Sequence, residues 1–147
     1  MSEPQTLSRT TPLAQVMSTR PVTIELDAQP HLADTLMNHH AIHHLPVVKG
    51  GVLQGLISQR DLFRHMMSFF FVENNQEQHD FLDSFLDIPS IMTPDPLTLG
   101  PDDTLGAALD LMIEHKIGCV PVVNGNNQLV GILTESDLLR LMTLALA

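Results

Sequence analysis

The chain has 147 residues, 44% of them hydrophobic and 16% charged, so it can fold as one compact domain or two small halves without metals or disulfides. Its formal net charge of −10 would repel a phosphate backbone, which disfavours nucleic acid and anionic membrane surfaces as partners. One cysteine cannot form an intramolecular disulfide, and neither an apolar leader nor an apolar run of about 18 residues occurs, so we expect a cytoplasmic location.

The first half of the chain predicts strands and helices in the order β-α-β-β-α. Alternating apolar residues predict the first strand, a proline predicts the start of the first long helix, and a Gly-Gly turn joins the last two strands. The predicted elements are a helical turn capped by Thr11 and ending at Met17, a strand over 22–26, a helix from Pro30, strands over 45–48 and 52–58, and a helix capped by Ser58.

The second half predicts the same order again. Its elements are a strand over 97–99, a helix over 104–115, strands over 120–123 and 129–134, and a helix over 135–145. The two halves are joined by residues 65–90, which hold five of the six phenylalanines. Phe81, Leu82, Phe85 and Leu86 recur there at helical spacing and predict a further amphipathic helix. This insert serves either core packing or a dimer interface, or else docks a regulated protein.

The two halves align residue by residue. Met17 aligns with Met92 at an offset of 75 residues, and Asp61 aligns with Asp137 at an offset of 76 because the second turn is one residue longer. A repeat of this size predicts two supersecondary units that bury their apolar faces together about a pseudo-twofold axis. The predicted boundaries are an N-terminal segment 1–15, repeat one 16–64, the insert 65–90 and repeat two 91–147.

Signatures of enzyme chemistry do not occur in the sequence. It contains no GxGxxG, Walker or GxSxG motif, and Cys119 lies in the apolar run CVPVV, where a buried thiol is unreactive. We therefore predict a protein that is not an enzyme and has no obligatory cofactor.

Four histidines, His39, His40, His43 and His44, form the one cluster that resembles a metal site. On a helix they would pair at the i,i+4 spacing that metal ligands use. The following Leu45-Pro46 must end such a helix, however, and no carboxylate or cysteine is close in sequence. We interpret the cluster as an exposed helix end and predict no metal site, while a metal-dependent enzyme built on these histidines stays open as an alternative.

The junction between the last strand and the last helix carries a hydroxyl and an acid three residues apart in both repeats. Ser58 precedes Asp61, and Thr134 precedes Asp137. This spacing is typical of a capping box, which is a purely structural role. Capping is the favoured interpretation from spacing alone, but a helix N-terminus also favours an anion, and an aspartate there can accept hydrogen bonds from a ribose diol, so a binding role is available as well. Thr23 and Thr98, near the two strand starts, are either ordinary strand residues, which their positions alone favour, or ligand contacts.

Taken together, these motifs resemble a tandem of CBS domains (the cystathionine β-synthase type), also called a Bateman module. The motifs are MSTRPVT and MTPDPLT, LPVV and VPVV, and GLISQRDL and GILTESDL, and the match covers 16–64 and 91–140. The resemblance implies an α/β (α+β) fold of two β-α-β-β-α repeats packed sheet to sheet. It also implies clefts that hold AMP, ADP, ATP or S-adenosylmethionine, pairing into homodimers, and regulation of a partner protein.

The resemblance also implies which residues contact the ligand. Asp61 and Asp137 would hold ribose hydroxyls, Ser58 and Thr134 would lie near ribose or phosphate, and two short stretches would flank the adenine mainly through backbone groups. The implied ligand-binding residues are Thr23, His44, Leu45, Pro46, Ser58, Arg60, Asp61, Arg64, Thr98, Cys119, Val120, Pro121, Thr134, Asp137 and Arg140.

The two implied sites differ in charge. Repeat one has Arg60 and Arg64 around its aspartate and Arg20 before its first proline, whereas repeat two keeps only Arg140 and has Ser136 and Asp95 at the other two positions. Phosphate needs cations or amides, so we expect the Asp61 site to prefer a phosphorylated nucleotide and the Asp137 site to be weaker, empty or suited to a less anionic ligand. A module that binds no ligand and acts by protein interaction, and one that senses Mg²⁺ between subunits, stay open as alternatives.

Overall fold

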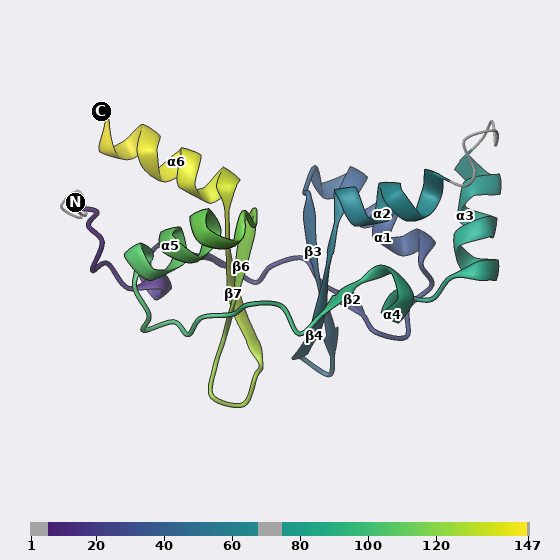
Figure 1. Ribbon diagram of the computed structural model, residues 1–147, viewed down its shortest axis with the longest axis horizontal. Coiled ribbons are helices and arrows are strands. Elements are labelled where there is room, and N and C mark those ends of the chain that lie inside the picture. The colour runs from purple at the N-terminus through teal and green to yellow at the C-terminus, as the bar shows by residue number, and fades with distance from the viewer. Residues whose placement is uncertain (1–5, 68–74, 147) are drawn as a thin grey trace. The chain divides into compact units, whose positions relative to one another are not determined.

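A computed structural model describes residues 6–67 and 75–146. The chain divides into two compact units (Figure 1). Unit 1 comprises Met1–Pro21 and Leu97–Ala147, and unit 2 comprises Val22–Pro96. Within the described residues, no helix is both long and apolar enough to cross a membrane.

Unit 2 is built on a four-stranded sheet with the strand order β2-β3-β4-β5. The strands are β2 (Ile24–Glu25), β3 (His44–Lys49), β4 (Val52–Ser58) and β5 (Thr93–Pro94). Parallel pairing joins β2 to β3, and antiparallel pairing joins β3 to β4 and β4 to β5. Every second residue of β4 is buried, as expected for a strand with one face on the core.

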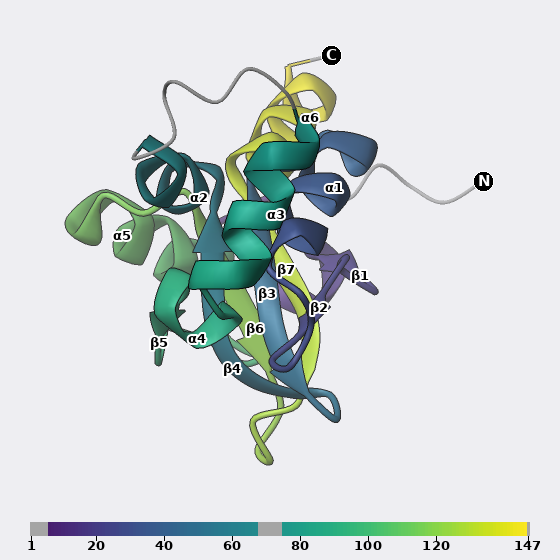
Figure 2. The same ribbon diagram turned by 90° about the vertical axis from the view of Figure 1, so that its right-hand side faces the viewer.

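The helices of unit 2 are α1 (His31–His40), α2 (Gln59–Met66), α3 (Asn75–Phe85) and α4 (Ile88–Ile91). Their apolar residues enter one core, which includes Met37, Leu62, Leu82 and Ile88 and packs on the inner face of the sheet. The insert thus contributes two helices to unit 2, and Figure 2 shows α3 running alongside α1.

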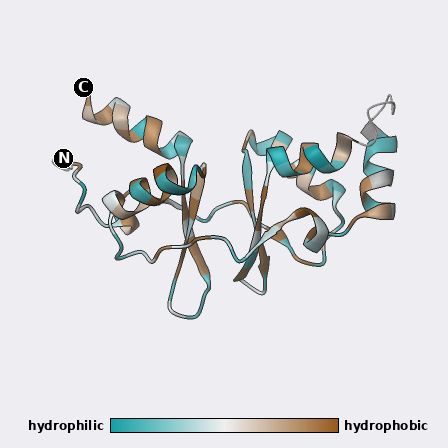
Figure 3. Ribbon diagram, in the orientation of Figure 1, coloured by the Kyte–Doolittle hydropathy of each residue, from teal (hydrophilic) through white to brown (hydrophobic). Residues whose placement is uncertain are grey.

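Unit 1 contains a three-stranded sheet with the strand order β1-β7-β6. Its elements are the 3-10 helix η1 (Leu13–Gln15), β1 (Ser18–Thr19), α5 (Leu105–His115), β6 (Cys119–Val123), β7 (Leu129–Thr134) and α6 (Glu135–Ala145). A second core holds Leu13, Leu105, Val120 and Leu133. In Figure 3 the strands of both sheets carry long hydrophobic stretches, which matches two separate cores.

The opening segments of the two repeats are exchanged between the units. Strand β1 starts repeat one in the sequence but pairs with β7 of repeat two, and β5 starts repeat two but pairs with β4 of repeat one. The preceding methionines are exchanged with them, because Met17 covers Gly131 and Met92 covers Gly55. Each compact unit therefore combines parts of both sequence repeats.

Most of the predicted elements are confirmed, and the mixed α/β class is correct. The strand over 52–58 and the helix over 135–145 have the predicted bounds, and the helix of the insert is present as α3. Ser58 caps α2 and Thr104 caps α5 through their side chains. Strands β1 and β5 were not predicted, because two-residue strands show no periodicity.

Three details of the prediction are wrong. Thr11 does not cap the first helical turn; its hydroxyl accepts a hydrogen bond from the Ser8 amide, and the turn is a 3-10 helix that begins after Pro12. Pro30 is the N-cap of α1 instead of its first residue. The strand over 97–99 is reduced to a single bridge between Leu99 and Val122.

Candidate ligand site at two strand-to-helix junctions

In unit 2 the candidate residues meet where β4 turns into α2. The pairing of β3 with β4 places His44 opposite Ser58 and Pro46 opposite Leu56, so the adenine-flanking stretch and the helix cap lie at the same end of the sheet. The Gln59 amide donates to the carbonyl of His43 over 2.8 Å and holds the start of α2 against the start of β3. Thr23 directly precedes Ile24, which pairs with Val47, so Thr23 lies at that end as well.

The Ser58–Asp61 pair forms a complete capping box. The Asp61 amide donates to Ser58 Oγ over 3.0 Å, and the Ser58 amide donates to Asp61 Oδ2 over 3.1 Å. The other oxygen, Asp61 Oδ1, accepts no hydrogen bond from the described residues. The structural role of Asp61 therefore uses one carboxylate oxygen and leaves the second available to a ligand.

Two cations flank this junction. Arg60 and Arg64 are exposed, and within the described part of the chain neither forms an ion pair. A guanidinium that is not already neutralised can bind a phosphate oxygen through charge-assisted hydrogen bonds. The junction of unit 2 thus offers one carboxylate acceptor and two cations.

Unit 1 repeats this arrangement where β7 turns into α6. Cys119 lies opposite Thr134 and Pro121 opposite Ile132, and the Glu135 amide donates to the Gly118 carbonyl over 3.1 Å. The Leu99–Val122 bridge places Thr98 at the same end as Pro121. Within each unit, the structure thus places the strand residues and the helix cap of one predicted site at the same end of the sheet.

Asp137 differs from Asp61 in its surroundings. The residue is 5% exposed, and both of its carboxylate oxygens are used. Oδ2 accepts from the amide and the hydroxyl of Thr134 over 2.9 and 3.0 Å. Oδ1 accepts from Ser18 Oγ over 2.7 Å and from Arg140 Nη2 over 2.6 Å.

Sequence reasoning missed Ser18 because the residue belongs to repeat one and acts in unit 1. A signal was present, since each repeat has a hydroxyl residue directly after its first methionine, Ser18 and Thr93. The exchange also alters the comparison of charge between the two sites. Arg20 belongs to repeat one but lies in unit 1, which holds most of repeat two, and Asp95 belongs to repeat two but lies in unit 2, which holds most of repeat one. Arg60, Arg64, Ser136 and Arg140 remain where the sequence placed them.

The residues expected to flank an adenine have buried side chains. Leu45, Pro46, Val120 and Pro121 are nearly or fully inaccessible, and Cys119 is 3% exposed. Because these side chains are buried, a ligand could meet these stretches only through backbone atoms or at the ends of the strands. His44 is the one partly exposed member of the set.

The thiol of Cys119 is expected to be unreactive in the native protein. Burial, reinforced by the negative charge of Glu135, raises the pKa of Cys119 to about 12, so at pH 8 roughly one thiol in ten thousand is ionised. We predict that a thiol-reactive chromogenic disulfide labels Cys119 at least 100-fold more slowly in buffer than in urea. Because the folded pKa exceeds the ordinary value of 9.0, the thiol's contribution to stability is complete below pH 9 and is lost as the pH rises toward 12. Equal labelling rates with and without urea would contradict a buried thiol.

The histidine cluster does not form one helical face. Helix α1 ends at His40, and Ala41 follows in the left-handed conformation with φ 53°, so His43 and His44 lie outside the helix. His43 pairs instead with Gln59, through Nδ1 and Oε1 at 2.7 Å. No group of three potential ligands close enough to hold a metal ion occurs among the described residues.

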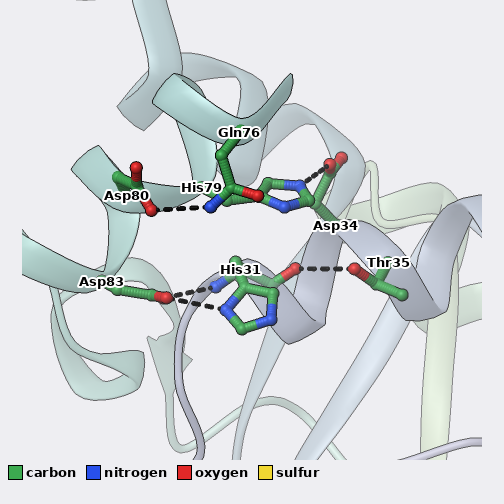
Figure 4. Close-up of polar contacts among 7 residues, drawn as sticks. All are labelled: His31, Asp34, Thr35, Gln76, His79, Asp80 and Asp83. Carbon is green, nitrogen blue, oxygen red and sulfur yellow. Dashed lines mark hydrogen bonds and ion pairs between the residues drawn. The ribbon is translucent and has the colours of Figure 1, made fainter. Parts of the chain in front are cut away.

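A second polar cluster, absent from the predictions, joins α1 to α3. The Asp83 carboxylate accepts from the His31 amide over 3.0 Å and pairs with His31 Nδ1 at 2.7 Å, while His79 Nε2 pairs with Asp34 Oδ2 at 2.9 Å (Figure 4). The two imidazole rings lie 5.2 Å apart between their centroids. These reciprocal contacts attach the insert to unit 2 and lie on different elements from the strand-to-helix junction.

Comparison with known protein families gives two matches to the CBS domain model, over residues 2–68 and 87–144. The chain is 36% identical over 129 residues to a CBS domain-containing protein of Dictyostelium discoideum, which covers 87% of this chain and 88% of that protein. It is also 33% identical to part of the inosine-5'-monophosphate dehydrogenase of Korarchaeum cryptofilum, but the match spans only 21% of that enzyme.

Two solved structures resemble the chain over nearly its whole length. A Vibrio cholerae protein described as the acetoin utilization protein AcuB is 29% identical with a TM-score of 0.76, and the match covers 93% of each chain. The CBS domain pair of protein MJ0100 is 27% identical with a TM-score of 0.74, over 91% of this chain and 97% of that chain. That pair was crystallised in complex with 5'-methylthioadenosine and S-adenosyl-L-methionine.

Proposed function

Because this chain belongs to the CBS domain family, we propose that it is a non-catalytic regulatory module that binds an adenosyl ligand at its strand-to-helix junctions. The candidate ligands are AMP, ADP, ATP and S-adenosylmethionine. The MJ0100 pair, which holds two adenosyl compounds, supports this ligand class. Binding would stabilise one conformation of the chain and so change its affinity for a regulated protein.

One observation carries the proposal for this chain. Asp61 keeps one carboxylate oxygen without a hydrogen bond from the described residues, at a helix N-terminus flanked by the unpaired Arg60 and Arg64. The carboxylate can accept from the vicinal hydroxyls of a ribose, and the guanidinium groups can bind phosphate.

Thermal unfolding in the presence of AMP, ADP, ATP, S-adenosylmethionine, Mg²⁺ and Zn²⁺ tests the proposal. A ligand at about 100 times its Kd stabilises the folded state by about 2.7 kcal/mol. For a chain of this length that raises the Tm by about 5 to 10 °C. We expect such a shift with at least one adenosyl compound.

Asp61→Asn should abolish that shift, because the amide replaces a charged acceptor with a weaker, mixed donor and acceptor. Asp27→Asn is the matched control, since Asp27 is an exposed aspartate of the same unit outside the junction. A shift given only by Zn²⁺ would favour the histidine-based alternative, one given only by Mg²⁺ would favour ion sensing, and both would contradict adenosyl binding.

A protein-interaction module without a ligand is the second candidate, and the exposed apolar side chains of α2 favour it. Phe63 is 63% exposed and Met67 is 56% exposed, and both follow the junction on or directly after the same helix. No thermal shift with any adenosyl compound would be the result expected of this candidate. The homodimer, the regulated protein and the cytoplasmic location implied by the sequence stay proposals, and light scattering tests the first of them.

A further inference from the structure

The aspartates of the two junctions occupy equivalent positions but are not equally available. Asp61 leaves Oδ1 without a partner among the described residues, whereas Asp137 Oδ1 accepts two hydrogen bonds, from Ser18 Oγ at 2.7 Å and Arg140 Nη2 at 2.6 Å. In a nucleotide complex, such a carboxylate would accept hydrogen bonds from the ribose hydroxyls and would lie near a cation that binds the phosphate. In unit 1 the chain itself supplies both.

Unit 2 contains the equivalents of both residues but places them differently. Thr93 corresponds to Ser18 and pairs with Leu56 through β5, yet its side chain is exposed and does not reach Asp61. Arg64 corresponds to Arg140 and forms no ion pair in the described part of the chain. The difference between the units is therefore one of arrangement, because both repeats have a hydroxyl and an arginine at these positions.

We propose that Ser18 and Arg140 form an intramolecular plug, in that their hydrogen bonds occupy the Asp137 carboxylate in place of a ligand. An adenosyl ligand then binds at Asp61 first and, at moderate concentration, at Asp61 alone. This inference rests on the proposed function. It assigns a regulatory role to Ser18, a residue at the start of repeat one that lies in unit 1. Movement of β1 away from β7 would open the second site.

The two halves of the plug differ in how readily they release Asp137. The Arg140 side chain is 73% exposed, so its guanidinium can rotate into water and exchange one set of hydrogen bonds for another. Ser18 lies in β1 and is paired with Ile132 of β7, so its hydroxyl leaves Asp137 only if its rotamer changes or the strand moves. Since the Asp137 side chain is only 6% exposed, water replaces these donors poorly, and a ligand must supply them.

Titration calorimetry with AMP on the full chain tests the plug. The wild type is expected to bind one AMP, and Asp61→Asn should weaken that event at least 10-fold. Ser18→Ala combined with Arg140→Ala should raise the stoichiometry to two, and adding Asp137→Asn should remove the second event. Ser18→Ala alone should also produce a second, weaker binding event that the wild type lacks, which keeps the test valid if the double variant folds poorly.

Arg9→Ala is the matched control. It removes an arginine of unit 1 from an ion pair with Asp110 that is exposed on both sides, 66% and 61%, and should leave the stoichiometry at one. Two equivalent AMP sites in the wild type, or one site in every variant, would overturn the plug while the proposed function stands. A wild type that binds no AMP, ADP, ATP or S-adenosylmethionine would overturn the proposed function and the plug together, so the two failures are distinguishable.

Discussion

Gly55→Ala is expected to lower the free energy of unfolding by about 2 to 3 kcal/mol, in the upper part of the range for overpacked sites. A Cβ at this position would lie 2.8 Å from the carbonyl oxygen of Thr93 and 2.5 Å from Met92 Sδ. The thioether can rotate away, but the Thr93 carbonyl belongs to β5, which is hydrogen-bonded to β4 at this point. The substitution therefore forces the exchanged segment away from the sheet of unit 2.

The chain provides two controls of graded severity. At Gly131 the close atoms all belong to the flexible Met17 side chain, so Gly131→Ala should cost less than Gly55→Ala. At Gly125 nothing lies within 4 Å, so Gly125→Ala should change stability by less than about 0.5 kcal/mol. Urea denaturation followed by circular dichroism measures all three. Equal effects at the three positions would show that β5 does not press on Gly55.

The sequence alone predicted which residues recur but not which ones meet. Methionine and glycine occupy equivalent positions in both repeats, and that pattern is visible in the alignment of Met17 with Met92 and of Gly55 with Gly131. Either methionine could have covered the glycine of its own repeat. Local periodicity carries no information on pairing between segments distant in sequence, so the exchange emerges only from the structure.

The same lack of information on distant pairing decides which parts of the candidate site could be predicted from the sequence. The capping boxes of Ser58 with Asp61 and of Thr134 with Asp137 are local patterns whose two residues lie three positions apart, and the structure confirms both. The contact of Ser18 with Asp137 joins residues 119 positions apart, and no spacing rule predicts it. The contribution of Ser18 was therefore not predictable from the motif around Asp137, although the charges of the two motifs alone predict a weaker Asp137 site.

Leu82→Ala is expected to destabilise the protein by about 2 to 5 kcal/mol, the usual cost of deleting a buried leucine side chain. Leu82 is fully buried in the core of unit 2, although it belongs to the insert that has no counterpart in repeat two. On the same helix, Asp83 and His79 pair with His31 and Asp34 of α1. The apolar and polar contacts together predict that α3 unfolds with unit 2 and not separately from it.

Phe85→Ala is the control on the same helix. Phe85 is 73% exposed, so its loss should change the free energy of unfolding by less than about 0.5 kcal/mol. Urea denaturation gives the two stabilities, and hydrogen exchange of the α3 amides shows whether they open with the β3 and β4 amides. A large effect at Leu82 and none at Phe85 would show that α3 is held to unit 2 through its buried face. Comparable small effects at both positions would mean that α3 is an appendage, and that unit 2 is stabilised by its sheet, α1 and α2 alone.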